Sequence, residues 1–237
     1  MSTPTAQQDE LDDHQHVVVD KTALWSRRSL MGSSLALAEA TVFAAAPTYA
    51  ADALLRPTGA DDIGPFYPQS LTAIQDFDLT RKKGHKTPAA GKLLYVSGRV
   101  LTPKGEPVSD ALIEVWQANS AGRYAHPGDD SASPLDPNFQ GFARIRSGKD
   151  GGFRLKTIYP GAYGNRTRHI HFDVGGQRSR LVTQMYFEGE PKNDTDDLLK
   201  AHGVEDRKTL ISRPGSPTGN QERDALVAEW DIVLAFG

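Results

Sequence analysis

Cysteine is absent from the 237-residue sequence, and neither positive nor negative charge is in large excess. Without cysteine the chain has no disulfide framework, no thiol nucleophile and no Cys-ligated zinc or iron–sulfur site. Its 27 Lys and Arg against 30 Asp and Glu give a net charge of −3. That balance lacks the basic excess with which proteins bind nucleic acids or anionic membrane surfaces. The 22 glycines and 15 prolines interrupt the chain too often for a helix bundle or a coiled coil.

The N-terminal segment differs in character from the rest of the chain. A polar, acidic stretch precedes Arg27 and Arg28, and a weakly apolar run follows over Leu30–Ala46. A basic pair, a short apolar run and small residues at a cleavage site are typical of a secretory signal. Paired arginines indicate the twin-arginine type. The run is too polar for a transmembrane helix, which needs about 20 apolar residues. We expect a tail and signal over 1–50, export to the periplasm or beyond, and a membrane-free mature domain over 51–237. An amphipathic N-terminal helix is the alternative.

The mature segment is predicted to consist of short β-strands separated by turns. Strands are expected over Leu93–Leu101, Ala111–Gln117, Ala143–Arg146, Phe153–Ile158, His169–Val174, Leu181–Phe187 and Trp230–Phe236. The turn Lys149-Asp150-Gly151-Gly152 between two of them is a hairpin signal. Helix is expected only near Asp196–His202 and Gln221–Ala228. Such a pattern predicts an all-β fold, an antiparallel β-sandwich core with long loops and little helix.

His169 and His171 are separated by one residue on a predicted strand. Because side chains alternate along a strand, both imidazoles face the same side and could present two nitrogens to one metal. No carboxylate stands at metal-ligand spacing beside them, which disfavours a hydrolytic zinc site or a two-histidine, one-carboxylate iron(II) site. The alternative is a structural histidine pair.

Tyrosines accompany the histidines. Tyr159 and Tyr163 precede them closely, and Tyr124 ends a turn earlier in the chain. A phenol has a pKa of about 10, so holding it as a phenolate at pH 7 costs about 4 kcal/mol. A hard, highly charged cation offsets that cost, and iron(III) is balanced by two phenolates and one hydroxide beside two neutral imidazoles. The alternative is that Tyr124 and Tyr163 are ordinary strand-end aromatics with buried rings.

Several motifs follow one another in order along the mature segment. They are Gly64-Pro65-Phe66-Tyr67-Pro68, Ala111–Asn119, Gly122-Arg123-Tyr124, Leu135–Phe139, Thr157–Tyr163, Arg166–Phe172, Thr183–Gly189 and Trp230–Leu234. Together they resemble the intradiol ring-cleavage dioxygenases, most closely the protocatechuate 3,4-dioxygenase branch. The resemblance runs from about Asp61 to Leu234. It implies a β-sandwich fold, in agreement with the strand pattern.

The resemblance implies an Fe(3+) site completed by a solvent hydroxide. Its protein ligands would be Tyr124, Tyr163, His169 and His171. Tyr163 matches the family's axial tyrosine, which leaves the metal when substrate binds. Arg166 matches an arginine that the family keeps close to bound substrate, where it would stabilise negative charge, and Gln184 matches a pocket glutamine. Arg166, Tyr163 and Gln184 are therefore the expected catalytic residues.

The substrate pocket is expected to include Gly64, Pro65, Tyr67 and Arg168. Only five residues separate Tyr163 from His169, fewer than in the protocatechuate branch, so a shorter pocket rim and larger catechols are expected. Arg168 is an addition to the family pattern, which leaves open whether Arg166 or Arg168 faces the substrate. Tyr159 is an alternative metal ligand in place of Tyr163.

The function implied by the resemblance is oxidative cleavage of a catechol-type ring between its two hydroxyl carbons. Both atoms of O₂ would enter a cis,cis-muconate-type product. Two other classes are alternatives: a non-catalytic exported β-sandwich accessory module, and a protein that binds catechol or metal without turnover. The identity of the catechol, the oligomeric state and the need for a second subunit stay open. Dimerisation through the N-terminal helical segment of the catechol and hydroxyquinol branches is not expected.

Overall fold

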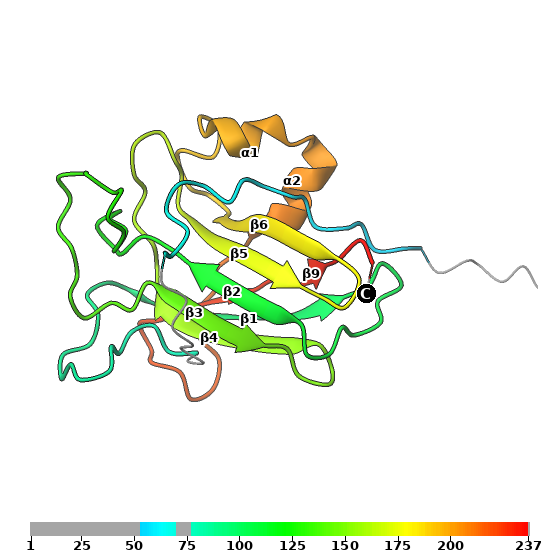
Figure 1. The fold of residues 1–237 in the computed structure, drawn as a ribbon, viewed down its shortest axis with the longest axis horizontal. Helices are drawn as coiled ribbons and strands as arrows, with labels where there is room; N and C mark the ends of the chain where they lie inside the picture. Colours follow the sequence, from blue (N-terminus) through cyan, green and yellow to red (C-terminus); the bar gives the residue numbers. More distant parts are fainter. Residues whose placement is uncertain (1–52, 70–76, 237) are drawn as a thin grey trace, which may run out of the picture. The chain divides into compact units, whose positions relative to one another are not determined.

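The computed structural model describes residues 53–69 and 77–236, and the predicted tail and signal over 1–50 lie outside the described residues. Two β-sheets make up this part of the chain (Figure 1). The first sheet contains β1 (Leu93–Leu101), β4 (Gly152–Ile158), β8 (Leu226–Glu229) and β9 (Ile232–Val233). The second runs in the order β3 (Phe142–Arg146), β2 (Leu112–Trp116), β5 (His169–Gly175), β6 (Arg180–Phe187) and β7 (Ile211–Ser212). The predicted all-β sandwich is confirmed.

The core follows from the alternation of side chains along the strands. On β5, Ile170, Phe172 and Val174 lie in one hydrophobic cluster, which also contains residues of β1, β2, β4 and β6. Their neighbours His169, His171 and Asp173 therefore face the opposite side of the sheet. Unlike the usual outer face of a sheet, this side of β5 is also buried. Loops and side chains that cover it create the environment in which the histidines lie.

Three strand pairs depart from the antiparallel pattern. β1 pairs antiparallel with β4 but parallel with β8 and β9, and β6 pairs parallel with β7. The C-terminal strand predicted over Trp230–Phe236 is reduced to the two residues of β9. The expected helix near Gln221–Ala228 is wrong, because Leu226–Glu229 is β8. Its backbone bonds to β1 replace those that a short helix would make.

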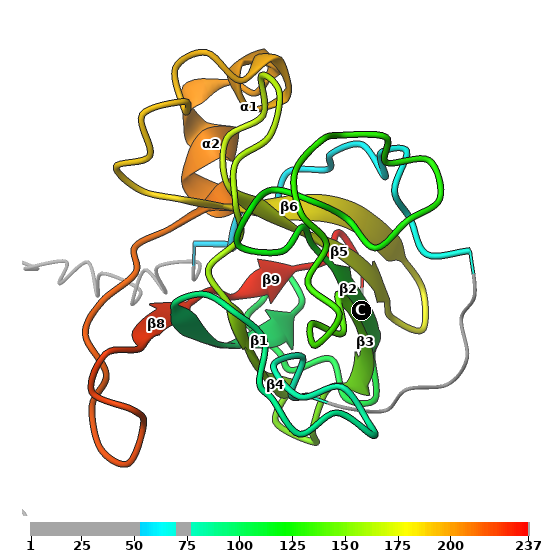
Figure 2. The same ribbon diagram turned by 90° about the vertical axis from the view of Figure 1, so that its left-hand side faces the viewer.

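Two short helices, α1 (Asp197–Ala201) and α2 (Val204–Leu210), lie beyond β6, away from β1 and β4 (Figure 2). The first confirms the helix expected near Asp196–His202, and the second was not predicted from the sequence. The carboxylate of Asp196 caps α1 by accepting hydrogen bonds from the N–H groups of Leu198 and Leu199. None of the helices in the described residues has the length and apolar character needed to cross a membrane.

Candidate metal and substrate site

Strand register brings the candidate residues together on the covered face of the second sheet. His171 lies opposite Trp116 of β2 and Gln184 of β6, and His169 lies opposite Tyr186 of β6. The ring of Trp116 stacks on that of His171, with centroids 4.8 Å apart and planes 6° from parallel. The histidine pair is thus held in place from both neighbouring strands.

Four donor atoms converge at this point. The Nε2 atoms of His169 and His171 are 3.2 Å apart, and the Oη of Tyr124 is 3.1 Å from the second of them. The Oη of Tyr163 is 3.3 Å from Nε2 of His169. Neighbouring ligands of one small cation, with bonds of about 2.0–2.1 Å, are separated by about 3.0–3.4 Å. The four side chains predicted as ligands have the donor types and mutual distances that fit a single metal ion.

The protonation of the imidazoles also fits a metal. The Nδ1 of His169 lies 2.7 Å from the carbonyl oxygen of Thr167, so Nδ1–H donates there and leaves a lone pair on Nε2. Burial, assisted by the positive charge of Arg166, lowers the pKa of His169 to about 3. Burial likewise lowers the pKa of His171. Both rings are therefore neutral at pH 7, which is the form that binds a metal.

The two phenols require a cation if they are to ionise. Burial raises the pKa of Tyr124 well above its usual value, and burial also raises that of Tyr163. Tyr124 is almost fully buried, whereas Tyr163 is half-buried. Tyr163 is therefore the phenol with more freedom to move and more access to solvent.

Two glycines explain how loops far apart in sequence place the tyrosines side by side. A Cβ at Gly122 would lie 2.5 Å from the carbonyl oxygen of Ala162, and one at Gly161 would lie 2.1 Å from the nitrogen of Gly122. Only glycine allows the two backbones to approach so closely. The rings of Tyr124 and Tyr163 consequently meet edge to face, with centroids 5.4 Å apart.

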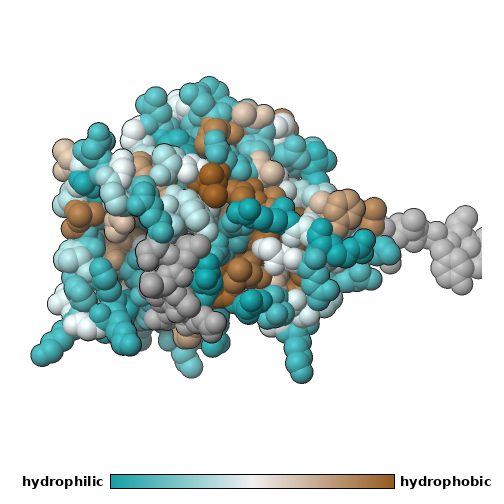
Figure 3. Space-filling model, in the orientation of Figure 1, coloured by the Kyte–Doolittle hydropathy of each residue, from teal (hydrophilic) through white to brown (hydrophobic). Residues whose placement is uncertain are grey.

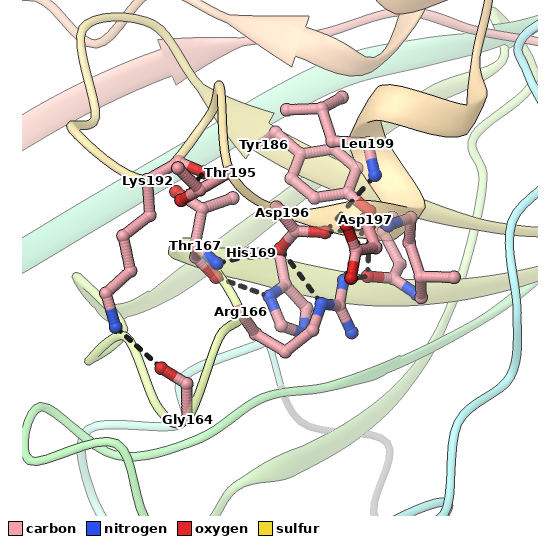
Figure 4. A network of polar contacts seen from close by, with 12 residues as sticks. Gly164, Arg166, Thr167, His169, Tyr186, Lys192, Thr195, Asp196, Asp197 and Leu199 are labelled. Atoms are coloured by element: carbon pink, nitrogen blue, oxygen red, sulfur yellow. Dashed lines mark hydrogen bonds and ion pairs between the residues drawn. The ribbon is translucent and has the colours of Figure 1, made fainter.

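Arg166 lies beside His169 and is fixed by buried partners (Figure 4). Its Nε donates to Oδ2 of Asp196 at 2.9 Å, and its Nη2 donates to Oε1 of Gln184 at 2.5 Å and to Oη of Tyr186 at 3.2 Å. Asp196 also accepts the N–H of Thr167 at 2.8 Å. Sequence reasoning found Arg166 and Gln184 but missed Asp196 and Tyr186. Tyr186 could have been found, since it stands two residues after Gln184 on the same strand face.

Arg168, which is predicted to line the substrate pocket, does not join the donor cluster. Its Nε donates to Oε2 of Glu190 at 3.0 Å, and its guanidinium lies over the ring of Tyr159, 5.2 Å from the centroid. The hydroxyl of Tyr159 donates to Oε1 of the same glutamate at 2.7 Å. The structure thus places Arg166 rather than Arg168 at the site, and it places Tyr159 outside the donor set.

The 64–68 loop covers the cluster through backbone and an aromatic ring. A Cβ at Gly64, whose φ is +72°, would lie 3.3 Å from Cε1 of His171. Phe66, which sequence reasoning did not single out, packs on Tyr124 and Tyr163 with centroids 4.7 and 6.1 Å away. Pro65, between them, is exposed.

Tyr67 supports the site from the side instead of facing the donors. Its hydroxyl donates to Oε2 of Glu114 at 2.6 Å, and its ring meets Trp116 edge-on at 5.0 Å. Burial, with the hydrogen bond to Glu114, raises the pKa of Tyr67 to about 12. Tyr67 therefore stays a neutral phenol that holds the tryptophan.

Within residues 53–69 and 77–236, no group of three or more His, Cys, Asp or Glu side chains could hold a metal ion. A metal at this position would depend on the two phenols together with the two imidazoles. This agrees with the chemistry expected of a hard trivalent cation, for which anionic oxygen ligands are favourable.

Comparison with known proteins gives consistent matches. Residues 63–236 match the Dioxygenase_C family model, described as dioxygenase. The chain is 44% identical over 185 residues to the protocatechuate 3,4-dioxygenase beta chain of Burkholderia cepacia, covering 74% of each chain. It is 34% identical over 117 residues to catechol 1,2-dioxygenase 1 of Acinetobacter lwoffii, covering 41% of this chain and 37% of that protein. The solved dioxygenase domain of a carbohydrate-binding fusion protein from Streptomyces sp. SirexAA-E superimposes with a TM-score of 0.60 at 30% identity, covering 77% of this chain and 100% of that one.

Proposed function

Because the chain belongs to the dioxygenase family, as an enzyme of the intradiol ring-cleaving type, we propose that it opens catechol rings between their two hydroxyl-bearing carbons. The observation that carries the proposal is the convergence of two phenols and two neutral imidazoles, in which the donor atom of each group lies 3.1–3.5 Å from that of at least one other. This donor set fits iron(III), which Tyr124, Tyr163, His169 and His171 would hold. Bound there, the ion would supply the Lewis acidity that stabilises a catecholate and enables its reaction with O₂.

Tyr163 has the position of a base for the incoming catechol. As a phenolate it would accept one hydroxyl proton of the substrate and turn away from the cluster. It is half-buried, and the exposed Gly164 that follows it has φ +47°. Tyr124 lacks that freedom, because its N–H is held by Oδ2 of Asp129 at 2.7 Å and its side chain is almost fully buried.

Arg166 supplies fixed positive charge beside the reacting oxygens. Its guanidinium is oriented by Asp196, Gln184 and Tyr186, so little reorganisation is needed when negative charge develops. Incorporation of both oxygen atoms yields a dicarboxylate of the cis,cis-muconate type. Arg166 is well placed to stabilise the negative charge that precedes this product.

The test is the visible spectrum of the purified protein, before and after anaerobic addition of catechol. Phenolate bound to iron(III) gives a broad charge-transfer band, and we expect this band to shift when catechol binds. Oxygen uptake on admitting air then separates an enzyme from a binding protein. A protein that stays colourless after iron loading contradicts the proposal and favours the accessory-module alternative. A coloured protein that consumes no oxygen with any catechol favours the binding-protein alternative.

Export is part of the proposal. The sequence over 1–50 supports export, since a basic pair precedes a short apolar run that ends in small residues typical of a cleavage site. N-terminal sequencing of the protein recovered from the periplasmic fraction should find cleavage near Ala50. Recovery of the uncleaved chain only from the cytoplasm would contradict it.

A further inference from the structure

Three zones lie side by side on the covered face of the second sheet. Over β6, Gln184 and Tyr186 hold Arg166 and form a polar wall. Over β5 lie the two histidines of the candidate metal site. Over the ends of β2 and β3 lie aromatic rings, since Trp116 is the register neighbour of both His171 and Phe142. A catechol bound through its oxygens at the candidate metal site would have a polar side toward β6 and an aromatic side toward β3.

The aromatic side contains a cavity of about 350 Å³. Its walls include Phe66, Trp116, Tyr124, His126 and Phe142, and none of the described residues that line it is Lys, Arg, Asp or Glu. Two of these residues also belong to the candidate site, because Tyr124 provides a donor atom and Trp116 stacks on His171. Apolar side chains also gather near the middle of the molecular face shown in Figure 3, among hydrophilic ones. The cavity is large enough for a ring substituent of several carbon atoms.

The arginines closest to this cavity in sequence have their own partners. Arg123 donates to the carbonyl oxygens of Ser133 and Asp129 at 3.0 and 2.9 Å. Arg144 donates from Nε to Oε1 of Glu114 at 2.7 Å. Arg166 lies over β6, on the other side of the histidines, and is bound to Asp196. A carboxylate on the aromatic side would therefore lose water without gaining a cation among these groups, which is unfavourable.

Resting on the proposed function, we propose that the preferred substrates are catechols whose ring carries an uncharged, apolar substituent. The cavity between Phe66, Trp116 and Phe142 receives that substituent, and carboxylated catechols are discriminated against. This substrate class differs from the one in the name of the protocatechuate 3,4-dioxygenase beta chain, although the chain is 44% identical to that protein.

The first experiment compares the iron-loaded full chain on catechol, 4-methylcatechol, 4-ethylcatechol and 3,4-dihydroxybenzoate. Burying a methylene contributes about 0.8 kcal/mol, so kcat/KM should rise about two- to fourfold per added carbon. The carboxylated substrate should be at least tenfold poorer than 4-ethylcatechol. Equal or better turnover of 3,4-dihydroxybenzoate overturns the inference while leaving the proposed function intact. No oxygen uptake with any of the four overturns the proposed function itself.

The second experiment adds a cation to the cavity wall. Gln69 is exposed and lines the cavity, so Gln69→Arg introduces charge without disturbing the core. The ratio of kcat/KM for 3,4-dihydroxybenzoate to that for 4-ethylcatechol should rise about fivefold, the effect of a partly exposed ion pair worth about 1 kcal/mol. The neutral Gln69→Met variant, of similar length, should leave this ratio as it is. If Gln69→Arg and Gln69→Met give the same kcat/KM ratio, the ring substituent does not bind in this cavity and the inference is overturned.

Discussion

The carboxylate of Asp196 accepts a hydrogen bond from Nε of Arg166 at 2.9 Å, and none of the Asp196 side chain is exposed. The same carboxylate accepts the N–H of Thr167 and caps helix α1. One side chain therefore joins the helix beyond β6 to the arginine of the candidate site. A buried ion pair of this kind is costly to break, because removing one partner leaves the other charge without compensation.

Replacing Asp196 by Asn should reduce kcat/KM about 10- to 100-fold while iron content is retained. The loss corresponds to about 1.5–3 kcal/mol for a hydrogen bond between charged groups. Steady-state oxygen uptake and metal analysis measure the two quantities. Asp197→Asn is the matched control. The side chain of Asp197 is 86% exposed, so its replacement should leave kcat/KM unchanged. Equal activity of both variants would show that Arg166 is oriented without Asp196.

The same residue predicts an acid-dependent stability. Burial alone would raise the pKa of Asp196, but the N–H of Thr167 and the charge of Arg166 outweigh it and lower the pKa below its usual 3.8. A carboxyl with a lowered pKa in the folded state stabilises the fold fully above the unfolded pKa, and this contribution is lost as pH falls through the folded pKa. The gap in Tm between the wild type and Asp196→Asn should therefore narrow below about pH 4. Thermal unfolding between pH 7 and 2.5 tests this, and a constant gap would contradict it.

Two tyrosines only four residues apart should differ strongly in how much activity depends on their hydroxyl groups. Tyr163→Phe removes a donor of the candidate site and a base, so oxygen uptake should fall about 100-fold or more. Tyr159→Phe removes only the bond to Glu190, so activity should change less than about twofold, with about 1 kcal/mol of stability lost. The visible band should shift in the first variant alone. An inactive Tyr159→Phe variant of unchanged fold would contradict the placement of Tyr163.

The imidazoles should be indispensable for metal binding. His169→Ala and His171→Ala each remove one of four donors from a buried site, so iron should be absent after loading. Metal analysis and the visible spectrum measure the effect. His85→Ala is the matched control, because His85 is exposed and its imidazole forms a hydrogen bond with the side chain of Asn138, away from the candidate site. Retention of iron by either site variant would mean that the metal lies elsewhere.

Most of the strands and the histidine pair follow from local pattern. The alternation on β5 predicts that His169 and His171 share a face, whereas Gln184 and the choice of Tyr124 and Tyr163 follow from the resemblance to the dioxygenases. The predicted helix over Gln221–Ala228 overlaps β8, and backbone pairing of β8 with the distant β1 and with Gly215 decides against it. Asp196 and Phe66 were missed for the same reason, because their roles depend on contacts across 30 and more residues of sequence.

Close approach of two backbones makes Gly98 a sensitive position of the first sheet. The N–H of Trp230 donates to the carbonyl oxygen of Ser97 at 2.9 Å, and a Cβ at Gly98 would lie 1.9 Å from the carbonyl oxygen of Trp230. Gly98→Ala must therefore displace the segment that joins β8 to β9, at a cost of about 1–3 kcal/mol or more. For a domain of this size each kcal/mol lowers Tm by about 2–4 °C. Gly175→Ala is the matched control, since a Cβ there meets no atom within 4 Å. Scanning calorimetry of both variants measures the difference, and equal Tm values would mean that the C-terminal strand moves aside at little cost.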